Sequence, residues 1–259
     1  MRVAAPFVLV DGREPAASDL FPFVLANDGH FTAMQVRDRA VRGIDLHLRR
    51  LVESHKRLYG TVLDPGSLRR WMQIAIADRP DAYLRVTVAE PDPGRPSVLT
   101  VVRPPLDPEP QPVALLPTVW TRAFPEVKHV GTFAQIQFAR EAEGAGFDDA
   151  LLVDEDGRLS ETTIANIAFA SGDEVVWPDG PALEGITWQL LEPALAEHGI
   201  FSRRASVALG DLDRFSGAVL VNSVGVSPVC RIGAHSFTES ADAAARLERI
   251  YRSVPEERI

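Results

Sequence analysis

Alternating apolar and polar positions in the first hundred residues predict strands separated by turns. The first apolar run predicts a strand that ends at Asp11, where an Asp-Gly pair marks a turn. Residues 30–43, HFTAMQVRDRAVRG, predict two strands around a turn near Asp38. Residues 82–90 and 97–103 alternate as two further strands, and the sequence PDPGRP between them predicts a turn.

Helical spacing follows the second predicted strand. Apolar residues at positions 46, 48, 51, 52 and 58 predict an amphipathic helix that Gly60 closes. Asp45 is the predicted N-cap of this helix, because aspartate accepts a hydrogen bond from the free amides of a first turn. The sequence GSLRRWMQIAIADR predicts a second helix.

A proline-rich stretch interrupts the pattern. Residues 101–117, VVRPPLDPEPQPVALLP, contain six prolines. Proline at this density disfavours helices and central strands and favours extended chain. We therefore predict an N-terminal domain over 1–105, an interdomain linker over 106–117 and a C-terminal domain over 118–259.

The second half also mixes strands and helices. Residues 132–146 predict a helix that stops at glycine, and residues 149–178 predict strands with a hairpin turn at Asp156-Gly157. A helix is predicted to end at His198-Gly199, and strand-like residues then precede a last helix over 240–254. Strands and helices in both halves predict an α+β fold.

Composition narrows the possible partners. The chain has 259 residues, a formal net charge of −9 and a pI near 5.2, which argues against nucleic acid or an anionic membrane as a partner. No stretch approaches the roughly 20 apolar residues of a membrane helix, and no signal peptide is evident, so we expect a soluble cytoplasmic protein. One cysteine allows no internal disulfide, and no Cys/His cluster has zinc-site spacing, so no metal is expected.

Lysine is rare in this chain. Lys56 and Lys128 are the only two, so arginine supplies the other 25 of the 27 basic residues. Arginine stays protonated in proteins, whereas lysine can lose its proton and act as a nucleophilic amine. Lys128 is therefore a candidate for chemistry that arginine cannot perform, the alternative being that both lysines are remnants of a coding bias.

Three further segments offer candidate chemistry. Glu161 and Asn166 lie among apolar residues, where a carboxylate needs a partner, either a salt bridge or a protonated ring nitrogen. Gly185 precedes a helix whose free amides suit an anion, although an ordinary strand-to-helix connection has the same sequence. A polar turn at Ser223 and a guanidinium at Arg50 offer further anion contacts.

In this order, the lysine, the Glu-x-x-x-x-Asn pair, the Gly-Ile-Thr helix start and the serine turn resemble the class IV aminotransferases. These are the fold-type IV enzymes that use pyridoxal 5'-phosphate. The resemblance runs from about Asp28 to Ile232 and includes the His-x-x-Arg-Leu helix. It implies a two-domain α+β fold with a small N-terminal α/β domain and a larger C-terminal domain with a barrel-like sheet.

The resemblance also implies a role for each matching residue. Lys128 would form the Schiff base with the cofactor and then move protons, Glu161 would pair with the pyridine nitrogen, and Leu183 would pack on one ring face. The residues implied to bind the phosphate are Arg50, Ile186, Thr187, Ser223 and Val224, and Gly185 before the helix is a further cofactor-binding position. A homodimer is implied as well.

Five positions depart from the family pattern. Ala168 stands where an aromatic residue is usual, and Trp177 and Trp188 replace a threonine and a basic residue. Phe31 and Phe133 stand where D-amino-acid and branched-chain transaminases, respectively, usually have a tyrosine.

Lys128 followed by histidine resembles aminodeoxychorismate lyase, the lyase branch of the family, and Arg95 falls in that branch's arginine-bearing loop. We predict an aminotransferase that moves an amino group between an amino acid or amine and a 2-oxo acid. The alternatives are 4-amino-4-deoxychorismate lyase, which releases pyruvate and 4-aminobenzoate, and a binding homologue without catalysis. Phe31 and Arg95 are the candidate substrate contacts.

Overall fold

The computed structural model describes residues 5–106 and 110–259, which form two compact units. The N-terminal unit contains the described residues up to 106 together with Val127–Gly131 and Glu256–Ile259. The remaining described residues form the C-terminal unit. Residues 1–4 of the predicted N-terminal domain and residues 107–109 of the predicted linker lie outside the described residues.

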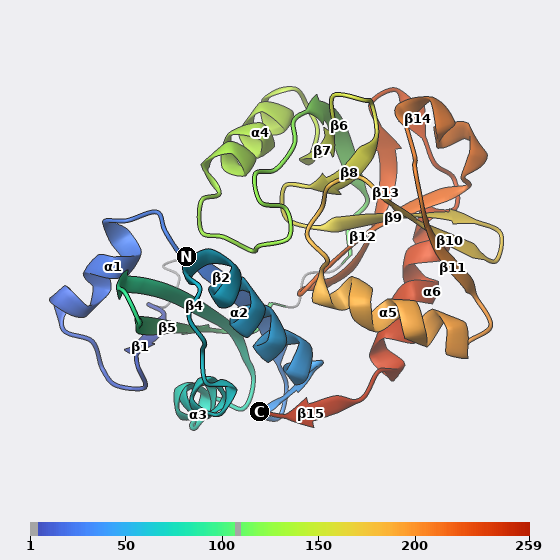
Figure 1. The fold of residues 1–259 in the computed structure, drawn as a ribbon. Helices are drawn as coiled ribbons and strands as arrows, with labels where there is room; N and C mark the ends of the chain where they lie inside the picture. Colours follow the sequence, from blue (N-terminus) through green and yellow to red (C-terminus); the bar gives the residue numbers. More distant parts are fainter. Residues whose placement is uncertain (1–4, 107–109) are drawn as a thin grey trace. The chain divides into compact units, whose positions relative to one another are not determined.

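The N-terminal unit is an antiparallel sheet covered by helices (Figure 1). The sheet order is β1-β5-β4-β2, and β15 pairs separately with β3. The elements of this unit are β1 (Phe7–Val10), η1 (Ala17–Leu20), α1 (Phe21–Val24), β2 (His30–Val36), β3 (Ala40–Arg42), α2 (Ile44–Tyr59), α3 (Pro65–Ile76), β4 (Ala82–Asp92), β5 (Arg95–Arg103) and β15 (Glu256–Arg258).

Alternation along the strands builds the core of this unit. Met34 and Val36 of β2 enter the same apolar cluster as Leu51 of α2 and Met72 of α3. Successive strand residues point to opposite faces of a sheet, so the even-numbered positions of β2 face the helices. The predicted strands and both predicted helices are confirmed.

Glycines and turn residues set the boundaries. Gly43 and Gly60 adopt left-handed φ angles of 70° and 74° at the two ends of α2. Asp45 is therefore not the N-cap: the left-handed turn at Gly43 starts the helix earlier, and Asp45 lies in the first turn, where a negative charge suits the helix dipole. The predicted turns at Asp11 and Asp38 are present, with φ of 50° and 44°.

The C-terminal unit is a nine-stranded sheet with helices. The chain order along its path is β11-β10-β9-β12-β13-β6-β7-β8, with β14 paired to β13. Its elements are β6 (Val113–Val119), α4 (Phe133–Gly144), β7 (Asp149–Val153), β8 (Leu159–Thr162), β9 (Asn166–Ser171), β10 (Glu174–Pro178), α5 (Ile186–Glu197), β11 (Phe201–Ala205), η2 (Leu209–Arg214), β12 (Gly217–Asn222), β13 (Gly225–Ile232), β14 (His235–Ser236) and α6 (Ser240–Ser253).

A second pairing closes this sheet into a barrel-like form. β8 pairs with β7 and also with β9, where Glu161 lies opposite Asn166. On β9, Ile167 and Phe169 enter one apolar cluster, and the intervening Ala168 enters another that contains residues of α5 and α6. Figure 1 shows α5 and α6 beside the strands that they contact. The prediction of an α+β fold with a barrel-like sheet is confirmed.

The proline-rich stretch differs from the prediction. Residues 113–117 of the predicted linker belong to β6 (Val113–Val119), a central strand between β13 and β7. Pro117 is tolerated because the pairing with β13 ends at Leu115, so the missing N–H of Pro117 removes no bond on that side. Proline density alone therefore misjudged this segment.

Two short segments group with the N-terminal unit although they fall within residues 118–259. Val127–Gly131 forms backbone hydrogen bonds to the start of β2, and Glu256–Arg258 pairs with β3. Such pairings join short segments that lie far apart in the sequence, so a hydrophobic pattern does not predict them. Within the two described ranges of the chain, no helix is long and apolar enough to cross a membrane.

Candidate active site

Lys128 lies in a short segment that is bound to the edge of β2. The Phe31 N–H donates to the Lys128 carbonyl at 2.8 Å, and the Val130 N–H donates to the Gly29 carbonyl at 2.9 Å. The two bonds flank an antiparallel bridge between His30 and His129. The backbone of Lys128 is therefore fixed by the sheet of the N-terminal unit rather than left in a free loop.

The side chain of Phe31 lies close to two cations. Lys128 Nζ is 5.0 Å from the centre of the Phe31 ring, and the Arg85 guanidinium is 3.6 Å from it. Both distances suit a cation over an aromatic face. The structure thus brings together two predicted residues, Phe31 and Lys128, and adds Arg85 of β4, which the sequence analysis missed.

Arg85 is a half-buried cation. Its Nε donates to the Thr87 hydroxyl at 3.2 Å, and among the described residues no carboxylate forms an ion pair with it. Burial lowers the pKa of Arg85, and the nearby Arg103 lowers it further. Its alternation with core residues on β4 was the available signal, because Arg85 falls on the opposite face from Leu84 and Val86.

His47 lies in the same electrostatic environment as Lys128. Its Nδ1 is 2.6 Å from the Thr32 hydroxyl, and the side chain is buried. Burial lowers the pKa of His47 well below its usual value, and the positive charges of Arg50 and Lys128 lower it further. The imidazole is therefore neutral at pH 7, and the predicted residues Arg50 and Lys128 both act on it.

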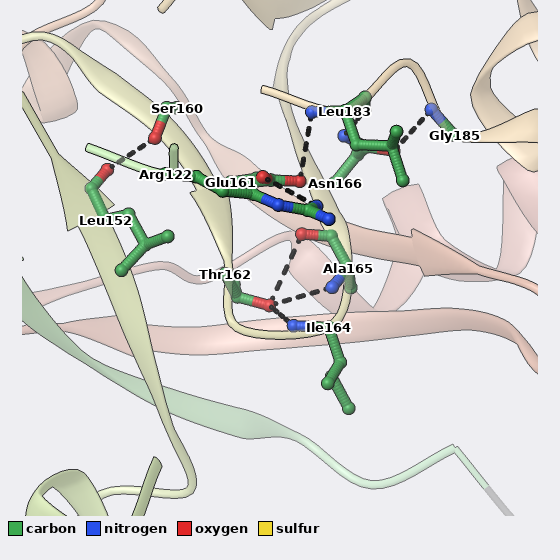
Figure 2. A network of polar contacts seen from close by, with 10 residues as sticks. All are labelled: Arg122, Leu152, Ser160, Glu161, Thr162, Ile164, Ala165, Asn166, Leu183 and Gly185. Carbon is green, nitrogen blue, oxygen red and sulfur yellow. Dashed lines mark hydrogen bonds and ion pairs between the residues drawn. The ribbon is translucent and has the colours of Figure 1, made fainter. Parts of the chain in front are cut away.

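In the C-terminal unit, Glu161 and Asn166 hold one loop from two sides (Figure 2). The Leu183 N–H donates to Glu161 Oε2 at 3.3 Å, and Asn166 Nδ2 donates to the Leu183 carbonyl at 2.7 Å. The Gly185 N–H donates to Asn166 Oδ1 at 3.1 Å. The five-residue spacing of the motif therefore places a carboxylate and an amide side by side across a tight hairpin, where both fix the approach to α5.

Arg122 is the second residue that the sequence analysis missed. Its Nη1 is 3.5 Å from Glu161 Oε1, and the two side chains are each 7% exposed. Figure 2 shows the guanidinium alongside the carboxylate. The salt bridge that the sequence left open is thus present, although only the fold reveals which of 25 arginines provides it.

Gly185 has no room for a side chain. A Cβ atom at this position would lie 2.1 Å from Asn166 Oδ1. Gly185 is the N-cap of α5, so Ile186 and Thr187 are the first two residues of the helix. Their amides face the N-terminal end of the helix, which favours an anion.

Asn222 connects the turn at Ser223 to the start of α5 by hydrogen bonds. The Thr187 hydroxyl donates to the Asn222 carbonyl at 2.7 Å, and the Val224 N–H donates to Asn222 Oδ1 at 2.8 Å. The predicted phosphate contacts Ile186, Thr187, Ser223 and Val224 therefore come from two connected turns of one unit. The hydroxyl proton of Thr187 is donated to a backbone carbonyl.

Two predicted positions lie at the surface. Arg95 is exposed at the β4–β5 turn, opposite Asp92. Phe133, the first residue of α4, is 72% exposed.

The two unusual tryptophans explain each other. Trp177 and Trp188 stack with ring centres 5.1 Å apart, and both are buried. The Arg204 guanidinium lies 4.4 Å from the centre of the Trp188 ring. The aromatic pair fills the space between β10 and α5, so the two departures from the family pattern are a single packing change.

Comparison with known proteins identifies the family. The family model described as "Amino-transferase class IV" matches residues 29–232, which is more than half of the chain. The chain belongs to the class IV aminotransferase family, and the predicted membership is confirmed.

Individual relatives are more distant. A probable branched-chain-amino-acid aminotransferase of Rickettsia felis is 27% identical over 111 residues, which cover 40% of this chain and 38% of that protein. The match thus spans less than half the length of this curated relative.

Solved structures share the fold over nearly the whole chain. The branched-chain aminotransferase of Thermoproteus uzoniensis with norvaline has a TM-score of 0.84 at 20% identity, covering 96% of this chain and 94% of that one. A hypothetical aminotransferase of Mycobacterium tuberculosis in its PLP-bound form has a TM-score of 0.80 at 21% identity and covers 95% and 98%. A putative 4-amino-4-deoxychorismate lyase of Legionella pneumophila has a TM-score of 0.78 at 20% identity and covers 88% and 91%.

Proposed function

We propose that this chain is a pyridoxal-phosphate-dependent aminotransferase that moves an amino group between an amino acid or amine and a 2-oxo acid. The observation that carries the proposal is the placement of Lys128. Lys128 is one of only two lysines in this chain. Its backbone is hydrogen-bonded to the edge of β2, and its amine lies over the Phe31 ring. A fixed amine is what a lysine that binds a cofactor aldehyde requires.

The residues present fit the chemistry of this cofactor. Glu161 is a buried carboxylate, which suits a protonated ring nitrogen, and the start of α5 suits a phosphate. The collision of a Cβ at Gly185 with Asn166 means that the backbone at this helix start is closely packed and held in one conformation. We assign phosphate binding to Arg50, Ile186, Thr187, Ser223 and Val224. Gly185 is assigned to the cofactor site as the residue before the helix, and Leu183 to contact with a ring face.

When bound, pyridoxal phosphate withdraws electrons from the bond broken at the amine-bearing carbon of the substrate. Lys128 would hold the cofactor and, once released, would carry a proton to and from that carbon as a neutral amine. Glu161 would pair with the ring nitrogen in its protonated form. Arg122 Nη1 lies 3.5 Å from Glu161 Oε1 and would hold this carboxylate in place.

Arg85 is a stronger candidate than Arg95 for binding a substrate carboxylate. Arg85 shares the Phe31 ring with Lys128 and lies half-buried, whereas Arg95 is exposed on a turn. A guanidinium without a carboxylate partner among the described residues has its fork available for a carboxylate. We propose that Arg85 sets a preference for carboxylate-bearing donors, and Arg85→Leu should raise KM for an amino acid more than for an uncharged amine.

Covalent labelling tests the role of Lys128. Borohydride reduction of the purified protein loaded with pyridoxal phosphate should attach the cofactor to the peptide that contains Lys128. Lys128→Arg keeps the charge but should abolish both labelling and turnover, because arginine provides no neutral amine. The matched control is Lys56→Arg on the exposed face of α2, which should label as the wild type does. Labelling at Lys56, or none in saturated protein, would contradict the proposal.

A second variant tests the ring partner. Glu161→Gln should lower turnover by one to two orders of magnitude, because a charge-assisted hydrogen bond contributes about 1.5–3 kcal/mol and about 1.4 kcal/mol is tenfold in rate. A normal rate in this variant would mean that Glu161 only holds the loop at Leu183.

One observation favours a lyase as the second candidate. The aromatic residue next to Lys128 is Phe31, which has no hydroxyl to reach the cofactor. A half-reaction separates the two activities: the loaded enzyme is mixed with L- and D-amino acids and (R)-amines without an acceptor. A transaminase should convert its absorbance band to that of the aminated cofactor in stoichiometric amount. If no donor does so and aminodeoxychorismate yields pyruvate and 4-aminobenzoate, the lyase is correct.

We further propose a cytoplasmic homodimer. The proposal rests on the family resemblance. Sedimentation of the purified chain at micromolar concentration should give twice the mass of 28.3 kDa. A mass of 28.3 kDa would exclude the dimer under those conditions.

A further inference from the structure

A buried polar chain lies at one end of the N-terminal core. The helix-facing positions of β2 and β4 include the apolar Met34, Val86 and Val88, and further along the same face lie the polar residues Thr32, His30 and Glu90. His30 and Glu90 face the C-terminal half of α2. The apolar pattern of both strands is thus interrupted at the end nearest the Lys128 segment.

Three side chains form a continuous path there. Glu90 Oε2 is 2.9 Å from His55 Nε2, and His55 Nδ1 is 3.3 Å from His30 Nε2. The Thr61 hydroxyl donates to Glu90 Oε2 at 2.5 Å, and the Gly94 N–H donates to Glu90 Oε1 at 2.8 Å. The side chains of His55 and Glu90 are 0% and 4% exposed, so the path is closed to solvent.

The hydrogen bonds define the protons on this path. The bond from Thr61 and then that from the Gly94 amide lower the pKa of Glu90, so Glu90 accepts as a carboxylate. His55 therefore carries its proton on Nε2 and accepts at Nδ1 from His30 Nε2–H. Burial and, to a smaller extent, the neighbouring His55 together lower the pKa of His30 to about 3. Both rings are neutral at pH 7, and each has one fixed tautomer.

The end of this path is the residue that pairs with the Lys128 segment. The backbone of His30 forms the bridge to His129, between the bonds from Phe31 N–H and Val130 N–H. The side chain of His30 points toward α2, and its neighbour Phe31 points to the opposite face, toward Lys128 Nζ. One strand position is therefore held by its side chain on one face and holds the Lys128 segment by its backbone.

We propose that Glu90, His55 and His30 form a positioning relay that fixes the end of β2 and thereby the backbone of Lys128. The inference rests on the proposed function only in the use it gives to Lys128. The three residues act through the backbone of β2 and are therefore positioning residues.

Core stability alone does not account for the relay. A buried polar network that contains a charge generally stabilises a fold no more than apolar side chains of the same volume would. Apolar side chains, however, allow several rotamers and small shifts of a strand end. A path with two fixed tautomers and a carboxylate held by Thr61 and Gly94 has one arrangement, which suits a strand end that holds the Lys128 segment by its backbone.

Amide hydrogen exchange of the purified full-length protein tests the relay without reference to catalysis. In His55→Leu and His30→Leu, the amides of Phe31 and Val130 should exchange about tenfold faster or more. His30→Gln keeps an N–H that reaches His55 Nδ1, so it should stay within about threefold of the wild type. The reference amides of Leu84 and Val86, in the middle of β4, should keep their wild-type rates in all three variants.

A matched control removes a buried hydroxyl away from the relay. Thr100 is fully buried and its hydroxyl donates to the Leu9 carbonyl, so Thr100→Val should leave the exchange of Phe31 and Val130 unchanged. Uniform acceleration of all amides in His30→Leu, or equal rates in His30→Leu and His30→Gln, would overturn the relay. If His55→Leu does not fold, the two His30 variants still decide.

The outcome separates the relay from the proposed function. If wild-type protein labels Lys128 but the His30 variants exchange like the wild type, the relay is wrong and the function stands. If the wild type does not bind pyridoxal phosphate but the His30→Leu amides are accelerated, the relay stands and the function is wrong. With both correct, His30→Leu should also lower kcat at unchanged KM, and His30→Gln should restore it.

Discussion

The two units of this chain bury polar groups in different ways. The N-terminal unit buries histidines, at positions 30, 47 and 55, whose pKa values all lie below the usual value because of burial. The C-terminal unit buries an arginine against a glutamate and uses an asparagine to hold a loop. A histidine network is neutral at pH 7 and sensitive to acid, whereas an Arg–Glu pair keeps its charges down to the pKa of the carboxylate. Lys128 therefore lies beside neutral buried histidines, which are sensitive to acid, whereas Glu161 lies in a charged ion pair.

The largest loss of stability is expected when the Arg122–Glu161 ion pair is broken. Arg122→Leu leaves Glu161 buried without this guanidinium, and removing one partner of a buried ion pair costs about 3–5 kcal/mol. Urea unfolding of the full chain should show this loss. The double variant Arg122→Leu, Glu161→Leu removes both charges and should recover most of it. A double variant as unstable as the single one would show that the pair is not the cause.

Acid should act on the histidine network. The pKa of His30 in the folded protein is about 3 against 6.5 in an unfolded chain, so the unfolded state binds more protons at intermediate pH. The stability that His30 provides is complete above pH 6.5 and is lost as the pH falls from 6.5 toward 3. At about 1.4 kcal/mol per pH unit, the loss for His30 is about 2 kcal/mol at pH 5.

Urea unfolding at pH 7 and pH 5 measures this loss. His30→Leu removes the titrating group and should lose less stability between the two pH values than the wild type does. Equal losses in both proteins would mean that His30 titrates in the folded state as it does in the unfolded chain.

A smaller effect is expected at the helix start of the C-terminal unit. Gly185→Ala places a Cβ 2.1 Å from Asn166 Oδ1, and overpacking of this kind costs about 1–3 kcal/mol. Affinity for pyridoxal phosphate should fall with it. The control is Gly144→Ala at the end of α4. A Cβ atom added there would have no neighbouring side chain or other segment within 4 Å, so stability should not decrease. Equal effects at the two glycines would contradict close packing at Gly185.

The smallest effect sharpens the contrast between neutral and charged networks. Thr32→Val removes the hydroxyl 2.6 Å from His47 Nδ1, and a neutral hydrogen bond contributes about 0.5–1.5 kcal/mol. Thermal unfolding at pH 7 should therefore show a far smaller shift than for Arg122→Leu. A loss as large as that of Arg122→Leu would mean that the two networks do not differ in strength.

The element pattern was largely readable from the sequence. The helix over Ile44–Tyr59 follows from spacing and from Gly60, and the hairpins follow from their turn residues, because these signals act within a few residues. The strand β6 was not readable. Whether Pro117 is tolerated depends on where the pairing with β13 ends, which is decided by strands more than a hundred residues away.

The sequence by itself determined the candidate residues Lys128, Glu161, Asn166 and Gly185, because lysine scarcity, buried polar groups and a glycine before a helix are local properties. Only the tertiary structure decided their partners. Arg122 meets Glu161, Arg85 meets Phe31, and His55 links Glu90 to His30, in each case across strands or a helix. The physical reason is that a buried charge or ring requires some partner, but any arginine or histidine of the chain would satisfy that requirement. Strand register and helix packing select one, and this selection is not encoded in a single segment.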